Sequence, residues 1–531
     1  MRAMKMKNAI SKMLVLAPIL ALLLTATAYG AAPGIQGTTF NLTAQDAYLT
    51  QPDGQSIYSW GYGCSASFVP TFAPKMTTTG FCNTMQVPGP TLIVVEGQSI
   101  TITLTNNLPP SAGNTSILFP GIQLQPFNDG TPGLLTQEAA HGQTVTYTFT
   151  APGPGTRAYY SGTQGDLQVE MGLYGAIIVL PKNVPSTCTA NTGSFAGNNG
   201  LAESAWGESD FRLAAAAYDH PKTCYDREYL FQFSEMDSNI HTQALAQVTA
   251  AGNCTAGNPG CSLNVPTEPY HPAYFMINGR SMPDDMDTNY ATQYPHQPYN
   301  GNPHMHPGEQ VLLRIIGQGR WQHPFHEHGN HVRILGRDGN LIVSATDPAN
   351  SLAGPLLFTT TTTPGMAMDG IFYWTAKGLN WDAYAHNSTS GDPNAKLPCI
   401  PDANGYNTSA PAAINYYEWC QDHNKPLQVA PFGDVAAGGP ATLPDPNIFT
   451  NGAWYGGSPY LGPNATIRAV GSTGTTPPSG TIANSPTGEA GFAFMWHSHN
   501  EREITTSNVF PGGMLMMMLV DSREFVIDES N

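Results

Sequence analysis

The stretch Thr91-Leu-Ile-Val-Val-Glu-Gly-Gln-Ser-Ile-Thr-Ile-Thr-Leu-Thr105 decides the fold class of this chain. It contains two runs rich in β-branched residues, which fit strands, on either side of a Glu-Gly turn. Thr144-Val-Thr-Tyr-Thr-Phe-Thr150 alternates polar and apolar residues with the period of two of a strand. Leu173-Tyr-Gly-Ala-Ile-Ile-Val-Leu180 is typical of a buried strand. Several short strands separated by turn residues predict a β-sandwich or barrel.

A second group of β-type runs begins at residue 228. These runs occupy residues 228–233, 274–279, 310–316, 331–335, 491–495 and 513–520. The segment 184–225 is rich in Asn, Gly, Ser and Ala, which indicates a linker. We therefore predict an all-β protein with an N-terminal domain at 34–183 and a C-terminal domain at 226–531. The Pro-, Gly- and Asn-rich region at about 382–488 predicts a long, loop-rich insertion in the second domain.

The composition agrees with this interpretation. The 531 residues are too many for one ordinary core. Charged residues make up only 11%, whereas Gly (55) and Pro (45) are frequent, which favours strands and turns over helices.

The first 28 residues have the features of a secretory signal. Their basic residues are Arg2, Lys5, Lys7 and Lys12. The apolar run 13–24 is too short to cross a bilayer comfortably, and Ala26-Thr-Ala28 offers small residues for cleavage. No later segment is apolar enough for a transmembrane helix. We predict an exported protein that is periplasmic, extracellular or on the cell surface, without membrane insertion.

The net charge excludes two classes of partner. The formal charge of the chain is -17, and loss of the first 28 residues, which carry four basic and no acidic residues, lowers it to -21. So acidic a surface repels nucleic acids and anionic membranes. We therefore expect no nucleic acid partner.

The eight cysteines are even in number, and disulfides persist in exported proteins. Proximity along the chain suggests the pairs Cys64–Cys82, Cys188–Cys224, Cys254–Cys261 and Cys399–Cys420. The sequence alone does not fix this connectivity. None of the cysteines stands next to the histidine motifs that follow.

Two distant stretches each contain a His-x-His pair. They are Trp321-Gln-His-Pro-Phe-His-Glu-His-Gly-Asn-His331, with His326 and His328, and Phe494-Met-Trp-His-Ser-His-Asn-Glu-Arg-Glu503, with His497 and His499. Residues i and i+2 of a strand point to one face, so two such pairs side by side place four imidazoles around one point. Imidazole suits copper and zinc, and the Irving–Williams order favours Cu(II) where copper is available. The alternative is that these histidines are buried and satisfied by hydrogen bonds.

Seven motifs spread over the chain are specific in combination. They are Val87-Pro-Gly-Pro-Thr-Leu-Ile-Val-Val-Glu-Gly-Gln, Phe119-Pro-Gly, the segment 129–136, Gly172-Leu-Tyr-Gly-Ala-Ile-Ile-Val, Ile277-Asn-Gly-Arg, His323-Pro-Phe-His-Glu-His-Gly and Trp496-His-Ser-His. Together they resemble the multicopper oxidases, which are built from cupredoxin domains. The resemblance covers most of the chain from about residue 40, except the linker and the insertion. It implies two cupredoxin-like Greek-key β-sandwich or barrel domains, where laccases have three.

The resemblance also implies a trinuclear copper cluster, which in this family reduces dioxygen and is held by four His-x-His pairs. The C-terminal two pairs are matched by His326, His328, His497 and His499. At the positions of the family's two N-terminal His-x-His pairs, this chain has Leu118-Phe-Pro-Gly121 and Tyr159-Tyr-Ser-Gly162, which contain no histidine. We therefore expect only half of the cluster ligands in this chain.

A type 1 copper, which takes electrons from the substrate, is held in the family by one cysteine and two histidines. His323 matches one of these histidines, and we predict it as a fifth metal ligand. Ser498 replaces the cysteine and Glu503 the second histidine. Because a hydroxyl cannot supply the thiolate of a blue copper site, we expect no type 1 copper.

Three carboxylates flank the histidines. Glu501 and Glu503 are the candidate catalytic residues, since they can orient ligand histidines, accept protons or add an oxygen ligand. The alternative is a salt bridge with Arg502 or Arg333. Glu327 alternates with its neighbouring histidines on an ideal strand, which predicts a surface or supporting position.

Other histidines and methionines are weaker candidates. His304 and His306 precede a Pro-Gly turn and are interpreted as surface residues. His331 is likewise a weaker candidate ligand. The methionines 514 and 516–518 lie in a predicted strand, where packing in the core is favoured over copper ligation.

Two functions of different classes follow. The first is a secreted, copper-binding, multicopper-oxidase-like oxidoreductase with a reduced, histidine-only site, acting on a small molecule or metal ion with dioxygen. The second is a non-catalytic exported metal carrier, or a cell-surface or filament protein, on a cupredoxin scaffold. A homo-oligomer cannot supply the missing histidines, because every copy lacks them, whereas a hetero-complex at the cell surface can. The sequence leaves open the substrate, the oligomeric state and whether turnover occurs.

Overall fold

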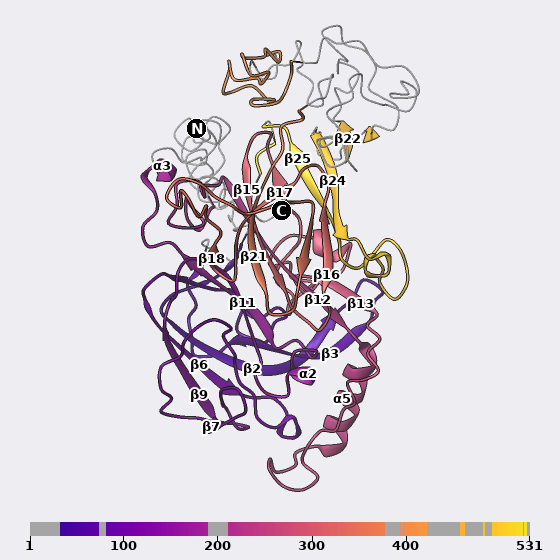
Figure 1. Cartoon of the computed structure of the whole chain (residues 1–531). Helices are drawn as coiled ribbons and strands as arrows, with labels where there is room; N and C mark the ends of the chain where they lie inside the picture. Colours follow the sequence, from indigo (N-terminus) through magenta and orange to yellow (C-terminus); the bar gives the residue numbers. More distant parts are fainter. Residues whose placement is uncertain are drawn as a thin grey trace, which may run out of the picture.

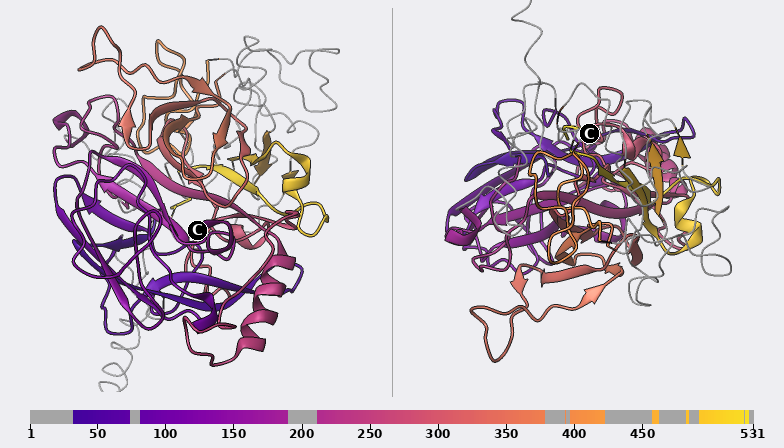
Figure 2. Two further views of the ribbon diagram at one scale, coloured as in Figure 1. Left: turned by 60° about the horizontal axis from the view of Figure 1, so that its bottom comes forward. Right: turned by 90° about the horizontal axis from the view of Figure 1, so that it is seen from above.

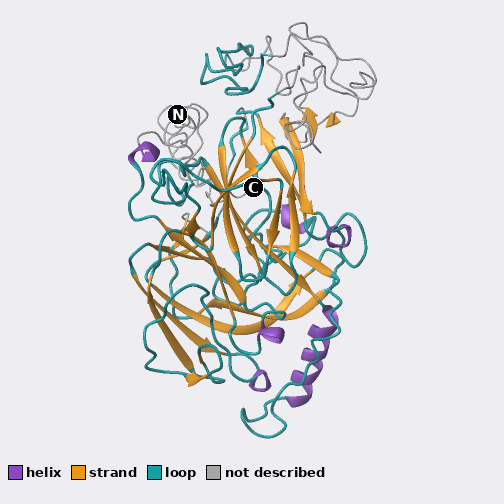
Figure 3. Cartoon of the chain, in the orientation of Figure 1, coloured by secondary structure: helices purple, strands orange, loops and turns teal. Residues whose placement is uncertain are grey.

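A computed structural model gives the fold of the chain. It describes residues 32–73, 81–189, 211–377, 393, 397–421, 457–461, 482–483, 491–523 and 525–527. The predicted signal at 1–28 lies outside the described residues, as do parts of the predicted linker and most of the predicted insertion. Figure 3 shows strands throughout the described chain, so the all-β prediction is confirmed.

The strands before residue 181 form two sheets around one core, drawn in indigo to magenta in Figure 1. The order of the first sheet is β10 (Gly155–Tyr160), β11 (Tyr174–Leu180), β5 (Leu92–Val95), β1 (Gly34–Gln36) and β4 (Phe72–Ala73). The order of the second is β3 (Ser56–Cys64), β2 (Thr39–Thr50), β6 (Ser99–Asn106) and β9 (Thr144–Thr150). Leu104 of the second sheet and Ile177 of the first are fully buried in the same core. We call this unit the first sandwich.

The fold-deciding stretch forms the two predicted strands, but they belong to different sheets. β5 pairs with β11 and β6 with β2, so the chain crosses from one layer to the other at the Glu96-Gly97 turn. In β9 buried residues alternate with more exposed ones, as its sequence predicts, whereas β11 is buried throughout. A two-stranded ribbon, β7 (Thr131–Pro132) and β8 (Gln137–Glu138), lies between β6 and β9 in the sequence.

The strands from residue 227 onward form a second pair of sheets, the second sandwich. One has the order β13 (Tyr274–Ile277), β12 (Arg227–Met236), β15 (Gln310–Gly317), β21 (Ala367–Tyr373), β17 (Val332–Arg337) and β18 (Asn340–Leu341), with β19 (Leu356–Leu357) on β17. The other has the order β14 (His304–Met305), β25 (Leu515–Asp521), β24 (Gly491–Ser498), β16 (His323–Glu327) and β20 (Thr359–Thr362), with β22 (Gly457–Leu461) and β23 (Ile482–Ala483) attached. Met514, Met516 and Met518 are buried in the core between them, which confirms their predicted packing role.

Helices are few among the described residues. The short ones are η1 (Pro110–Ala112), α2 (Gly165–Gln168), α3 (Ser186–Thr189), η2 (Asp284–Met286) and η7 (Glu501–Ile504). The long helix α5 (Ser238–Ala251) was not predicted. The side chain of Asp237 caps its first turn by accepting from Asn239 N, and Gly252 follows its last residue. Although it follows β12 of the second sandwich, α5 packs on the first, where Ile240 is buried in the core (Figures 1 and 2).

The two sandwiches meet through buried polar contacts. Asp369 of β21 accepts hydrogen bonds from Thr156 N (3.0 Å) and from the hydroxyls of Thr156 (2.6 Å) and Tyr218 (2.7 Å). Arg314 lies between Glu228 (2.9 Å) and Asp369 (3.5 Å). Because Thr156 belongs to the first sandwich, these contacts fix the two sandwiches relative to each other.

All four suggested cysteine pairs form disulfides: Cys64–Cys82, Cys188–Cys224, Cys254–Cys261 and Cys399–Cys420. Within the described ranges, no helix has the length and apolarity needed to cross a membrane.

Candidate metal centre

The two His-x-His segments lie side by side in neighbouring strands. β16 pairs antiparallel with β24, and His326 is the direct partner of His497. The ring centroid of His326 lies 4.7 Å from that of His328, 5.7 Å from that of His497 and 5.1 Å from that of His499. The atoms His328 Nε2 and His497 Nε2 are 3.2 Å apart. The structure thus brings together the four histidines, which we call the histidine cluster.

Side-chain alternation puts the histidine cluster on one face of the sheet. Phe325 and Trp496, at the intervening positions, are buried in the core of the second sandwich. The imidazoles therefore lie on the face that points away from this core. His326 is buried whereas His499 is exposed, so the cluster is open to solvent on one side.

Hydrogen bonds orient two of the four rings. His497 Nδ1 donates to the backbone oxygen of Ser498 (2.7 Å), and His326 Nδ1 lies 2.8 Å from Thr359 Oγ1. Burial and the other three imidazoles lower the pKa of His326 to about 4, and burial also lowers the pKa of His497. His497 is therefore neutral, with its lone pair on Nε2 facing His328.

His323 lies outside the histidine cluster and is held between two carboxylates. Its Nε2 is 2.9 Å from Glu235 Oε2, and its Nδ1 is 2.9 Å from Glu503 Oε2. All three side chains are buried. Burial alone would lower the pKa of His323, but the hydrogen bonds to Glu235 and Glu503 raise it to about 9. His323 is therefore an imidazolium that donates from both nitrogens, and in this state it has no lone pair for a metal.

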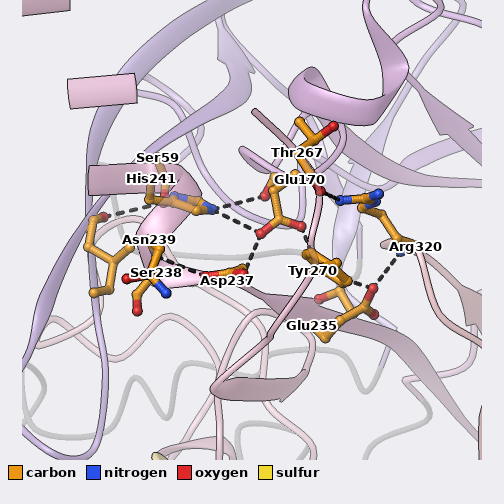
Figure 4. Close-up of polar contacts among 12 residues, drawn as sticks. Ser59, Glu170, Glu235, Asp237, Ser238, Asn239, His241, Thr267, Tyr270 and Arg320 are labelled. Carbon is orange, nitrogen blue, oxygen red and sulfur yellow. Dashed lines mark hydrogen bonds and ion pairs between the residues drawn. The ribbon is translucent and has the colours of Figure 1, made fainter. Parts of the chain in front are cut away.

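A buried chain of polar groups continues from Glu235 into the first sandwich. The hydroxyl of Tyr270 lies 3.3 Å from Glu235 Oε1 and 2.6 Å from Glu170 Oε2 (Figure 4). His241 of α5 contacts the backbone oxygen of Glu170 through Nε2 at 3.1 Å. Burial raises the pKa of Glu170 to about 8, although the hydrogen bond from Tyr270 opposes this. The Glu170 carboxyl is therefore largely protonated at neutral pH.

The two candidate catalytic carboxylates have different surroundings. Glu503 is buried and accepts a hydrogen bond from the hydroxyl of Ser498. Glu501 is exposed. Within the described part of the chain, neither forms the salt bridge with Arg502 or Arg333 that the sequence suggested as the alternative, since both guanidinium groups donate to backbone oxygens. Among the described hydrogen bonds, Glu503 is the one of the two that contacts Ser498, the residue between His497 and His499.

Glu327, for which a surface or supporting position was predicted, and the two histidines interpreted as surface residues are all buried. Glu327 points away from the histidine cluster, as alternation predicts, but it lies inside and accepts from Thr360 Oγ1 at 2.8 Å, and burial raises its pKa to about 8. His304 and His306 are also buried. His304 Nδ1 is 2.6 Å from the carboxylate of Asp521, so the pairing of β14 with β25, not the following Pro-Gly turn, decides the position of His304.

The N-terminal segments at the positions of the absent histidines also lie side by side. Leu118 N donates to Tyr160 O at 2.7 Å, and Tyr160 N donates to Leu118 O at 3.2 Å. Gly162 N donates to Ser116 Oγ at 3.2 Å. The two segments that the resemblance matches to the missing histidine pairs are thus neighbours in the first sandwich.

Sequence comparison points to one family. The model of the multicopper oxidase family matches residues 70–184. Over 107 residues the chain is 38% identical to a multicopper oxidase of Talaromyces pinophilus. These matches support the multicopper oxidase superfamily. The chain is also 38% identical over 96 residues to the L-ascorbate oxidase of Brassica rapa subsp. pekinensis.

These matches cover a small part of each protein. They span 20% and 18% of this chain, and only 17% and 16% of the two relatives. Among solved structures, the blue copper oxidase of Nitrosomonas europaea is 16% identical, with a TM-score of 0.44 over 90% of this chain and 85% of that one.

The residues that the resemblance matches to the type 1 position do not fit a type 1 copper. Ser498 Oγ and His323 Nδ1 both meet Glu503 Oε2, where the family has a cysteine and two histidines. The serine hydroxyl lacks the thiolate that defines such a site. Both nitrogens of His323 are taken by carboxylates.

The histidine cluster, in contrast, offers donors that fit copper. Two imidazole nitrogens about 2.0–2.1 Å from one ion lie roughly 3 Å apart, and His328 Nε2 and His497 Nε2 are 3.2 Å apart. Among the described residues, no group of three or more His, Cys, Asp or Glu side chains is already arranged to hold an ion. A third ligand therefore requires rotation of the His326 or His499 ring.

Proposed function

We propose that this protein is an exported copper-binding oxidoreductase whose metal site consists of histidines alone, without a type 1 copper. The observation that supports it most directly is the 3.2 Å approach of His328 Nε2 and His497 Nε2 within a cluster of four imidazoles. His326 and His499 complete the proposed ligand set. Copper is preferred over zinc at such a site where both ions are available.

A bound copper would supply one-electron redox chemistry, and the chain would hold and shield it. The Nδ1–H of His497, bonded to Ser498 O, keeps Nε2 available as the donor atom. The hydroxyl of Thr359 fixes the ring of His326. Phe358, which is 47% exposed, packs edge-on against His326 at 5.8 Å and covers one side of the site.

The proposed electron donor is a small molecule or a metal ion that approaches from solvent, with dioxygen as the acceptor. His499 is exposed, so a substrate can reach the histidine cluster without passing through the core. The donor set at Ser498, His323 and Glu503 offers no thiolate that could accept electrons at a separate site. Export is supported by the four disulfides.

Oxygen uptake tests this proposal. Copper-loaded protein should consume dioxygen with a phenol, cuprous ion or Mn(II) as reductant, and the His497→Ala variant should not. Copper binding without uptake for any of these reductants would contradict the oxidoreductase proposal and leave its copper-binding part standing.

The second candidate function is a non-catalytic metal carrier or a cell-surface structural protein. It is favoured by the positions of Leu118, Tyr160 and Gly162, where the scaffold of the first sandwich is retained but its imidazoles are lost. A carrier releases copper to an acceptor, so exchange of bound copper with a competing chelator within minutes, without oxygen uptake, would support it. A hetero-complex that supplies further histidines would instead show a changed EPR signal on mixing with its partner.

A further inference from the structure

Three buried residues at one end of the histidine-bearing strands come from three separate parts of the second sandwich. Glu235 is near the end of β12, His323 is the first residue of β16, and Glu503 lies in η7. His323 stands three residues before His326, and Glu503 four residues after His499. We call these three residues the triad. It therefore connects the segments that carry both His-x-His pairs.

Each carboxylate of the triad also accepts hydrogen bonds from neighbouring backbone or side-chain groups. Glu235 Oε1 accepts from Arg320 N (2.6 Å) and Trp321 N (2.8 Å), which fixes the turn that leads into β16. Glu503 accepts from the side chains of Asn500 (2.9 Å) and Ser498, which fixes the end of β24. The beginning of one histidine strand and the end of the other are thus tied to one imidazolium.

We infer that the triad of Glu235, His323 and Glu503 positions the two His-x-His pairs for a shared ion, and that its three hydrogen-bonded side chains take the structural place of a second metal. This inference rests on the proposed metal-binding function of the histidine cluster. The three are positioning residues, because none of them belongs to the proposed ligand set.

The energetics of a buried charged group support such a role. A buried histidine that donates from both ring nitrogens is stable only while both acceptor carboxylates remain in place. Removal of His323 leaves two buried carboxylates uncompensated, and removal of a carboxylate leaves one ring N–H without its acceptor. Either change favours entry of water and separation of the tied segments. The distance between His328 Nε2 and His497 Nε2 would then no longer be fixed.

The test uses the variants His323→Gln and Glu503→Gln of the full chain with two measurements. Hydrogen exchange of the metal-free protein should be at least tenfold faster in both 323–328 and 491–499. Titration with Cu(II) should show an affinity at least tenfold weaker, as for other changes around metal ligands, and the EPR hyperfine coupling should shift. If those variants do not fold, the milder pair Ser498→Ala and Ser498→Thr is used. Threonine keeps the hydroxyl that donates to Glu503 and should behave as wild type, whereas alanine removes it and should show both changes.

The matched control is Glu309→Gln, which breaks another buried ion pair of the second sandwich, with Arg227 at 2.6 Å. It should lower stability but leave exchange in the two histidine segments and the EPR signal unchanged. The inference is overturned if the triad variants match wild type in both measurements, or if Glu309→Gln changes them equally. Should wild-type protein bind no Cu(II), the proposed function fails, and the exchange measurement alone still decides whether the triad orders both segments.

Discussion

His326 lies directly opposite His497 in the antiparallel pair of β16 and β24, and this one pairing puts both His-x-His pairs on the same face of the sheet. A slip of one residue would turn one pair into the core, because side chains alternate between the two faces. Phe325 and Trp496 prevent such a slip, since both are buried on the opposite face. The candidate metal centre therefore depends on the same apolar packing that holds the second sandwich together.

Loss of one cluster histidine should abolish tight copper binding. His497→Ala removes the nitrogen that faces His328 Nε2 at 3.2 Å, and even changes to residues that only support metal ligands cost about 10–100-fold in affinity. We expect a loss of at least this size in a chelator-competition titration. Glu501→Ala is the control, because Glu501 is exposed; an equal loss in both variants would argue against a histidine site.

The type 1 position should accept a copper if its missing ligands are restored. Ser498 Oγ and His323 Nδ1 both meet Glu503 Oε2, so the double variant Ser498→Cys, Glu503→His places a thiolate and two imidazoles around that point. We expect Cu(II) to give the intense visible absorption of a copper thiolate in the double variant, and not in Glu503→His alone. A colourless, fully folded double variant would show that this position no longer has the family's geometry.

The buried Glu170 should make the protein less stable as the pH rises. Burial raises its pKa from 4.5 in the unfolded chain to about 8, so its contribution is complete below pH 4.5 and is lost as the pH rises through 8. Glu170→Gln mimics the protonated carboxyl and removes the pH-dependent contribution of Glu170 to the free energy of unfolding. Relative to wild type, the variant's free energy of unfolding should therefore increase by a few kcal/mol between pH 5 and pH 8.5, by urea denaturation. A difference that stays constant over this range would mean that Glu170 is already ionised in the folded protein.

The helix α5 should depend on its cap. Asp237 accepts from Asn239 N at 2.9 Å with one carboxylate oxygen and from His271 N at 2.8 Å with the other. Asp237→Ala should lower the free energy of unfolding by about 1–2 kcal/mol, by thermal denaturation. Asp237→Asn retains an acceptor for Asn239 N and should lose less of the free energy of unfolding. Equal losses in the two variants would show that the cap contributes little to stability.

The strands were predictable because their signals are local. The alternation in Thr144–Thr150 and the apolar run before Leu180 follow from side chains that meet one core. The helix α5 was missed, although Asp237 and Gly252 mark its two ends, because it buries only a few residues, among them Ile240 and Ala244, and so lacks a clear apolar stripe.

The residues of the candidate site were predictable from the sequence only where they form a recognisable motif. The i, i+2 spacing of the histidines identified the cluster, but nothing near Glu235 in the sequence indicates that it meets His323, 88 positions away. Similarly, the surface interpretation of His304 failed because its partner, Asp521, is 217 positions away. Such pairs are set by the packing of distant strands, which a single sequence does not reveal.

Elemental analysis of the purified protein, together with its visible and EPR spectra, tests the central claim most directly. We expect near-stoichiometric copper, an EPR signal of the type 2 kind and no intense blue absorption, with loss of the copper in His328→Ala as in His497→Ala. Protein that contains no copper or other transition ion after exposure to them, or that keeps its copper without His328 and His497, would contradict this claim.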